Sequence, residues 1–213
     1  MGKTSLLYRL KTKSGQLPST TTTIGIDFHT TTLQVNDTTV NFQLWDTAGQ
    51  EDFKSITTSF FRSAVAGLLV FDVTNRNSFH HLHEWIREAK SNSHPDHDIV
   101  LLLVGNKADL ETQREISYDE AECFAHQNNM KYIETSAKNG TNVQEAAVEM
   151  TKTLLSQIEG GELVGIQPSS NLTSTTTGLN ISSAASSCSF SPASLAQSTT
   201  ESVPHEKKRG CCR

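Results

Sequence analysis

The sequence has 213 residues, which is room for one ordinary domain and an appended segment. Its 23 acidic and 18 basic side chains give a formal net charge of -5, which argues against a nucleic-acid-binding protein with a broad basic surface. Its four cysteines, at positions 123, 188, 211 and 212, are too few and too unevenly spaced for a disulfide framework or a zinc site.

The first predicted element is a helix over residues 4–13, headed by the sequence Gly2-Lys3-Thr4-Ser5. A glycine, a lysine and a hydroxyl at a helix N-terminus offer a phosphate backbone N–H donors, a cation and a magnesium ligand. The complete phosphate-loop pattern is GxxxxGK[ST], of which the sequence holds the GK[ST] end. From this fragment alone, an ordinary helix start remains the alternative.

A Thr-rich loop and two predicted strands, over residues 28–35 and 40–45, come next. A turn-forming Asn-Asp pair lies between the strands and predicts a β-hairpin. The second strand runs into the sequence DTAGQ, residues 46–50. An aspartate at this strand end can reach a magnesium shell, and the glycine can bring its N–H to a terminal phosphate.

The chain then alternates short apolar runs with helical patterns. Strands are predicted over 66–73, 99–105 and 131–135, and helices over 77–90, 118–127 and 143–158. This alternation predicts the α/β class, with a mostly parallel sheet that also includes the antiparallel hairpin. Because the strands are continuously apolar, we expect helices on both faces of the sheet.

Two further polar motifs follow these strands, Asn106-Lys107-Ala108-Asp109 and Thr135-Ser136-Ala137-Lys138. A carboxylate at Asp109 can accept hydrogen bonds from the ring N–H and the amino group of guanine, whereas adenine lacks that amino group. The carboxyl ends of parallel strands meet at one edge of the sheet. Four motifs at such ends therefore predict one guanine-nucleotide site.

The composition changes after Glu159. More than half of residues 169–200 are Ser or Thr, with few apolar side chains to bury, so residues 160–213 are predicted to form a disordered tail. The tail ends in EKKRGCCR, where three cations precede the adjacent pair Cys211 and Cys212.

Together these motifs resemble the Ras-type small GTPases, and within them the Rab branch, from Gly2 to about Ile158. The Rab character rests on IGIDF, on LWDTAGQEDFKSITTSFFRSA and on LVFDVTN, while TNRNSF, IREAK and NMKYIETSAK are most similar to the Rab thirty-nine subgroup. The resemblance implies a small G domain of the P-loop NTPase fold over residues 1–159. We expect this domain to lack its first strand and the first half of the phosphate loop, because the sequence begins one residue before the loop's second glycine.

The resemblance also implies roles for individual residues, with GTP or GDP and Mg²⁺ as cofactors. Gln50 would orient the attacking water, and Mg²⁺ would be held by Thr4, Thr23 and Asp46. Thr23 is the last of four consecutive threonines, so a neighbour remains an alternative. The nucleotide would be bound by Gly2, Lys3, Thr4, Ser5, Thr23, Gly49, Asn106, Lys107, Asp109, Ser136, Ala137 and Lys138.

The partners implied are a nucleotide exchange factor, a GTPase-activating protein, a GDP-dissociation inhibitor or escort protein, and effectors at the switch regions; nucleic acid is not among them. Cys211 and Cys212 resemble a double geranylgeranylation site, and Lys207-Lys208-Arg209 would add attraction to anionic lipid. The implied function is a GTP-hydrolysing switch of vesicle trafficking. It would lie on the cytoplasmic face of endomembranes and cycle through the cytosol.

The alternative is a non-enzyme: a truncated, nucleotide-binding-deficient interaction module, or an incomplete gene model of a Rab. Loss of a central strand would expose two strand edges and much of the core. We expect such a loss to exceed the roughly 5 to 15 kcal/mol by which domains are stable.

Overall fold

The computed structural model describes residues 1–12, 17, 23, 26–35, 38–47, 61, 64–93, 98–160 and 178–181. In chain order its elements are α1 (Lys3–Thr12), β1 (Ile26–Val35), β2 (Thr38–Thr47), β3 (Ala66–Asp72), α3 (Arg76–His80), α4 (Leu82–Ser91), β4 (Val100–Asn106), the 3-10 helix η2 (Glu111–Gln113), α5 (Tyr118–Gln127), β5 (Lys131–Glu134), α6 (Val143–Glu159) and β6 (Gly178–Ile181).

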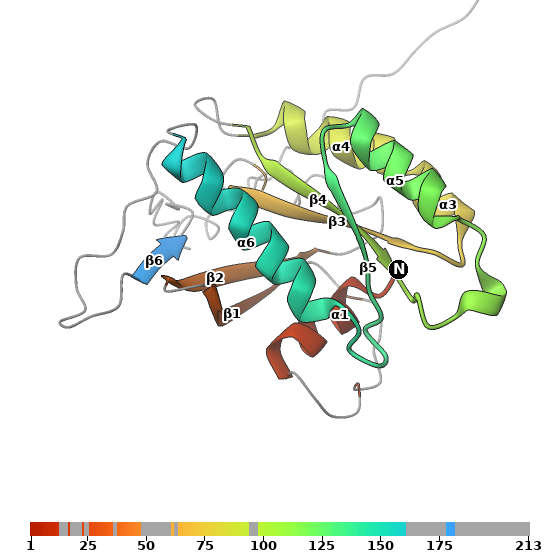
Figure 1. Cartoon of the computed structure of the whole chain (residues 1–213), viewed down its shortest axis with the longest axis horizontal. Helices are drawn as coiled ribbons and strands as arrows, with labels where there is room; N and C mark the ends of the chain where they lie inside the picture. Colours follow the sequence, from red (N-terminus) through yellow and green to blue (C-terminus); the bar gives the residue numbers. More distant parts are fainter. Residues whose placement is uncertain are drawn as a thin grey trace, which may run out of the picture.

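The strands form two sheets of three strands each, with the orders β1-β2-β6 and β3-β4-β5 (Figure 1). The hairpin β1–β2 is antiparallel along its whole length, from the pair Ile26 and Thr47 to the pair Val35 and Thr38. The strands β3, β4 and β5 pair in parallel. The α/β class and the antiparallel hairpin beside a parallel sheet are therefore confirmed.

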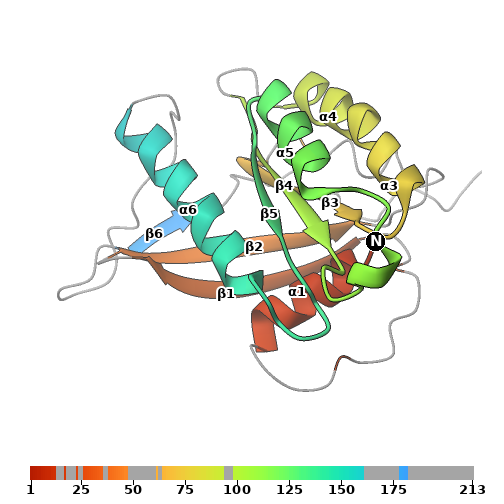
Figure 2. The same ribbon diagram turned by 45° about the vertical axis from the view of Figure 1, so that its right-hand side comes forward.

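Helices cover both faces of β4, which is buried along its whole length. The side chains of Leu102 and Val104 join a core cluster with α1 and α6, while those of Leu101 and Leu103 join a second cluster with α3, α4 and α5. This alternation follows from the two-residue repeat of a strand, which sends successive side chains to opposite faces. Figure 2 shows β4 between α6 on one side and α3, α4 and α5 on the other.

The two sheets are not hydrogen-bonded to each other through β2 and β3, but they share one core. Leu33 and Val40 of the hairpin belong to the same cluster as Val70 of β3. The sequence predicts one sheet, and the structure instead divides the strands while packing both parts against α1 and α6.

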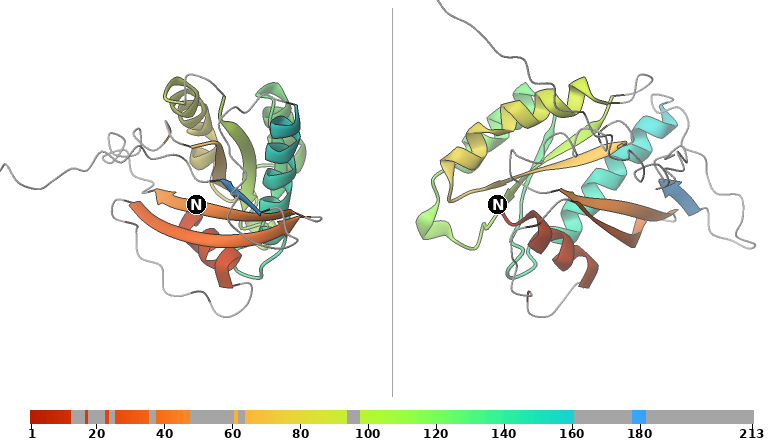
Figure 3. Two further views of the ribbon diagram at one scale, coloured as in Figure 1. Left: turned by 90° about the vertical axis from the view of Figure 1, so that its left-hand side faces the viewer. Right: turned by 180° about the vertical axis from the view of Figure 1, so that it is seen from behind.

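Two further differences concern single elements. The helix predicted over 77–90 is two helices, because His81 is both the C-cap of α3 and the N-cap of α4. The short strand β6 lies within the Ser/Thr-rich stretch where the sequence predicts no element, and it pairs in parallel with residues 39–42 of β2 (Figure 3). Among the described residues, no helix combines the length and the apolar character that crossing a membrane requires.

Candidate functional site

The predicted site residues gather at the carboxyl ends of the strands, next to the N-terminus of α1. Asp46 lies near the end of β2, Asn106 ends β4, and Thr135 follows β5. Figure 2 shows the chain start beside the tips of β3 and β4. The Nδ2 of Asn106 donates to the carbonyl of Met1 at 3.0 Å, which ties the start of the chain to β4. The strand-end motifs and the lysine-bearing helix start therefore share one edge of the molecule.

Beside the start of α1, three oxygen-bearing side chains lie within hydrogen-bond distance of one another. The Oδ2 of Asp46 accepts from the hydroxyl of Thr4 at 2.6 Å and from that of Thr23 at 3.2 Å. The two hydroxyl oxygens are 2.7 Å apart. Thr4 comes from α1, Thr23 from the segment before β1, and Asp46 from β2, so three separate parts of the chain meet at this carboxylate.

The second oxygen of Asp46 gives this cluster the character of a cation site. Asp46 is 1% exposed, and its Oδ1 has no hydrogen-bond partner among the described residues. A buried carboxylate oxygen without a partner is costly unless a cation or a donor satisfies it. Carboxylate and hydroxyl oxygens are the ligands that Mg²⁺ prefers. The residues present therefore fit the magnesium ion that the sequence predicts.

Lys3 lies one residue before Thr4, in the first turn of α1. Burial lowers the pKa of its ammonium below the ordinary value, although the nearby carboxylate of Asp46 acts in the opposite direction. A lysine held partly out of water is suited to an anionic ligand, because a nearby negative charge favours its charged form. Gly2 precedes it at φ +81°, and a Cβ there would approach the Nδ2 of Asn106 to 2.9 Å, so the close contact with β4 requires a glycine.

On the opposite side of the same edge, Ser136 orients Asp109. The hydroxyl of Ser136 donates to Asp109 Oδ1 at 2.6 Å, and the ammonium of Lys138 lies 3.8 Å from Oδ2. Both contacts hold the carboxylate of Asp109 in place. Asp109 is thus held as an acceptor, as the recognition of a guanine edge requires.

Asn106 organises the loop that follows β5. Its Oδ1 accepts from the backbone N–H of Ala137 at 3.1 Å and from the hydroxyl of Thr135 at 3.4 Å. The resemblance assigns the N–H of Ala137 to the oxygen of guanine, whereas here this N–H donates to Asn106. The loop therefore lies against Asn106, with the N–H of Ala137 directed at this side chain.

Asp72 is a residue of this edge to which the sequence reasoning gave no role. It ends β3, is 4% exposed, and its Oδ2 lies 2.6 Å from the ammonium of Lys107. Burial alone would raise the pKa of Asp72, but hydrogen bonds from Lys107 and Thr74 outweigh it and hold the pKa below its ordinary value. Lys107 has φ +67°, a backbone conformation that non-glycine residues rarely adopt. The sequence holds a hint of this role, because Asp72 ends its strand as Asn106 does, and Asp46 lies one residue before the end of its own.

Four predicted residues lie outside the described part of the chain: Gly49, Gln50, Cys211 and Cys212. Ser5 is described and lies in the first turn of α1.

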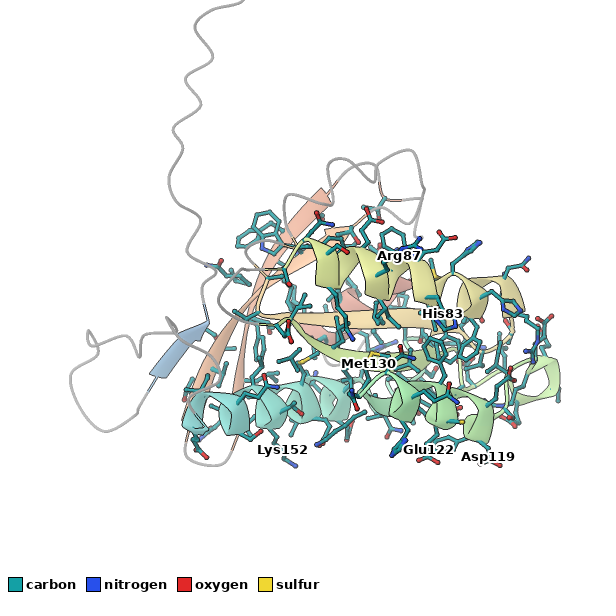
Figure 4. All side chains as sticks on the ribbon, turned by 90° about the horizontal axis from the view of Figure 1, so that it is seen from above. His83, Arg87, Asp119, Glu122, Met130 and Lys152 are labelled. Carbon is teal, nitrogen blue, oxygen red and sulfur yellow. The ribbon has the colours of Figure 1, made fainter. Side chains whose placement is uncertain are left out.

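A groove of about 640 Å³ lies elsewhere, between α5, β5 and α6. Figure 4 looks onto this side and labels Glu122 of α5, Met130 before β5 and Lys152 of α6, all of which line it. None of the predicted site residues contributes to its lining, which mixes acidic and basic side chains.

An aromatic pair lies on the hairpin. The rings of Phe28 and Trp45 are 4.7 Å apart across β1 and β2, and the two residues are 44% and 41% exposed. Large exposed aromatic side chains are typical of surfaces that bind other proteins.

The chain is similar to known proteins over most of its length. The model of the Ras family matches residues 1–156. The Ras-related protein Rab-39A of Mus musculus is 45% identical over 167 residues, covering 76% of each chain, and its Homo sapiens counterpart is 44% identical over the same length and shares. The Ras-related protein Rab-4 of Dictyostelium discoideum is 40% identical over 175 residues, covering 80% of this chain and 84% of the relative.

Proposed function

Because the chain belongs to the Ras family and to its Rab branch of small GTPases, we propose that it is a GTP- and GDP-dependent switch that hydrolyses GTP and regulates vesicle trafficking at membranes. The observation that carries the proposal is the buried carboxylate of Asp46. Its Oδ2 accepts from two hydroxyls while its Oδ1 has no partner among the described residues. This arrangement suits a cation bound together with the phosphates.

The residues around the start of α1 have distinct roles in binding the phosphates. Thr4, Thr23 and Asp46 hold Mg²⁺, which when bound neutralises phosphate charge. Lys3 places its ammonium against the outer phosphates, and Gly49 contacts the terminal one through its N–H. Catalysis of this kind depends on positioning and electrostatics, so an activating partner accelerates it by supplying groups the chain lacks.

The residues around Asp109 give the site its preference for guanine. Asp109, held by Ser136, accepts from the ring N–H and the amino group of the base. Asn106 and Lys107 brace the loop and the strand end, and Lys138 lies beside Asp109. An adenine base would leave this partly buried acceptor without the bond from the amino group of guanine, which costs much of the binding free energy.

The change of state follows from Thr23. Its hydroxyl reaches Thr4 and Asp46 from the segment before β1. Loss of the terminal phosphate removes a contact that holds this segment and the one after β2. The exposed pair Phe28 and Trp45 lies on the hairpin between these segments and supports binding of effectors and of the exchange, activating and inhibitor proteins there.

Membrane attachment in this proposal rests on the tail. Geranylgeranyl groups on Cys211 and Cys212 would anchor the chain, since stable anchoring takes two lipid chains or one chain with a basic segment. The anchored protein would work on the cytoplasmic face of endomembranes and return to the cytosol with its inhibitor or escort protein.

The guanine assignment is tested with Asp109→Asn in the full chain. The amide can donate to the C2 carbonyl of xanthine but no longer accepts two bonds from guanine, so GDP affinity should fall at least about a hundredfold while XDP affinity rises. Fluorescence titration with labelled nucleotides and Mg²⁺ measures both. Asp119→Asn, an exposed change on α5, is the control. Unchanged GDP affinity in Asp109→Asn contradicts the assignment, and a native chain that folds but binds no guanine nucleotide contradicts the proposed function.

A further inference from the structure

Arg9 is a buried arginine in the middle of α1, at 7% exposure. Arginine is rarely buried unless hydrogen bonds satisfy its donors. Its Nε donates to the carbonyl of Ala137 at 2.9 Å and its Nη2 to the carbonyl of Lys138 at 2.7 Å. One guanidinium therefore holds two successive carbonyls of the loop after β5.

The carbonyl of Lys138 is one end of a relay to Asp109. A peptide group is planar, so fixing this carbonyl also fixes the direction of the N–H of Asn139. That N–H donates to the hydroxyl of Ser136 at 3.3 Å, and Ser136 donates to Asp109 Oδ1 at 2.6 Å. Arg9 thus reaches the base-selecting carboxylate through one peptide group and one hydroxyl.

The carbonyl of Ala137 has a parallel effect. With this oxygen bound to Arg9, the N–H of Lys138 at the other end of the same peptide group faces away from α1. The stem of Arg9 also covers the turn of the loop, since a Cβ on Gly140 would lie 3.6 Å from its Cδ.

Helix α1 carries both the residues proposed to bind the phosphates and the arginine that holds the loop. Its first turn holds Lys3 and Thr4, and Arg9 lies further along the same rigid helix. A second bond, from Gln144 Nε2 to the carbonyl of Leu10 at 3.0 Å, joins the end of α1 to the first turn of α6. A helix held at both ends keeps its phosphate-side and loop-side contacts at a fixed separation.

We propose that Arg9 is a positioning residue that fixes the base-binding loop, residues 136–139, relative to the phosphate-binding start of α1. It touches neither the base nor the phosphates and acts through the Lys138–Asn139 peptide group and Ser136 on Asp109. This inference rests on the proposed function for its effect on nucleotide binding, and on geometry alone for its effect on the loop.

The loop is tested first, in the full chain without nucleotide, by hydrogen exchange. Arg9→Met keeps the length of the side chain and removes every donor, and Arg9→Lys keeps the charge with a single point of contact. The amides of Asn139 and Gly140, which bond to Ser136, should exchange at least about tenfold faster in Arg9→Met and by less in Arg9→Lys. The amide of Thr135, bonded to Gly105 of β4, should be unchanged. Lys11→Met, an exposed change on the same helix, is the control.

Nucleotide discrimination is tested second. In Arg9→Met the ratio of the ADP and GDP dissociation constants should fall at least about tenfold, with partial recovery in Arg9→Lys. A purely structural defect would weaken both nucleotides by the same factor, and that result overturns the proposal. So does loop exchange equal to the native rate in a folded variant; if Arg9→Met does not fold, Arg9→Lys carries both comparisons. Altered loop exchange in a chain that binds no nucleotide would support the positioning of the loop and refute the proposed function.

Discussion

At the scale of residues, Gln50 follows Asp46 by four positions, just beyond the end of β2. In the proposed function it orients the attacking water, while the residues that bind GTP lie elsewhere. Gln50→Leu should therefore slow GTP hydrolysis at least about tenfold and leave GTP affinity unchanged, because misplacing a reacting group costs on the order of 10²-fold. Single-turnover phosphate release with Mg²⁺ measures the hydrolysis rate. Gln43→Leu, an exposed change on β2, is the control. Equal turnover in Gln50→Leu and the native protein would remove Gln50 from the mechanism.

The sequence could predict which site residues lie near one another where they stand at or just after the ends of strands. Asp46 directly follows one predicted strand and Asp109 lies in the motif after another, and the structure gives them partners from motifs that the sequence named, Thr4 for one and Ser136 for the other. The resemblance assigned the N–H of Ala137 to an oxygen of guanine, whereas here it donates to Asn106, because the orientation of a peptide group in a loop depends on which acceptor lies nearby. Arg9 was missed for a related reason: a single arginine in a helix is usually solvated, and only the packed structure shows the carbonyls beside it.

At the scale of elements, periodicity predicted the class and most of the strands and helices. The side chains of β4 are apolar on both faces because each face of the strand packs against a different layer of helices. The break between α3 and α4 could not be predicted, since Phe79, Leu82 and Ile86 continue one apolar helical pattern across it. Strand β6 was missed because its pairing with β2 joins segments more than a hundred residues apart in a stretch of mostly Ser and Thr.

Asp72 joins two of these elements, because it ends β3 and pairs with Lys107 after β4. Its carboxyl pKa lies below the ordinary value in the folded protein. The stabilisation is therefore fully present above the unfolded pKa, near 3.8, and is lost as the pH falls through the folded value. Asp72→Asn should lower the free energy of unfolding by about 1 to 2 kcal/mol at pH 7, and the difference from the native protein should shrink below about pH 4.

Urea unfolding followed by circular dichroism, from pH 7 downwards, measures this difference. Asp98→Asn is the matched control, since Asp98 is exposed just before β4. A destabilisation by Asp72→Asn that stayed constant through the acid range would mean that the ion pair with Lys107 is not its source.

At the scale of the whole molecule, the chain combines a packed nucleotide-binding domain with a tail of opposite character. The domain buries two core clusters on either side of β4, whereas residues 169–200 offer mostly Ser and Thr. In the proposed function, a change of state in the domain would reach the membrane through a segment that has few apolar side chains to bury. The length of the tail and its lipid attachment, rather than rigid packing, would then set the distance between the bilayer and the proposed effector-binding pair, Phe28 and Trp45.

Changing the cysteine pair tests this arrangement. Two prenyl chains give stable anchoring, whereas one short chain gives marginal, reversible binding to which Lys207-Lys208-Arg209 can add attraction for anionic lipid. After prenylation, the native chain should float with vesicles whether or not they contain anionic lipid. A single change, Cys211→Ser or Cys212→Ser, should leave binding that depends on anionic lipid and weakens with salt, because screening acts on the basic segment. The double change should leave the protein in the soluble fraction. Cys188→Ser, in the same Ser/Thr-rich tail, is the control and should behave as native. Full flotation of the doubly changed protein would show that something other than these cysteines holds the chain at the membrane.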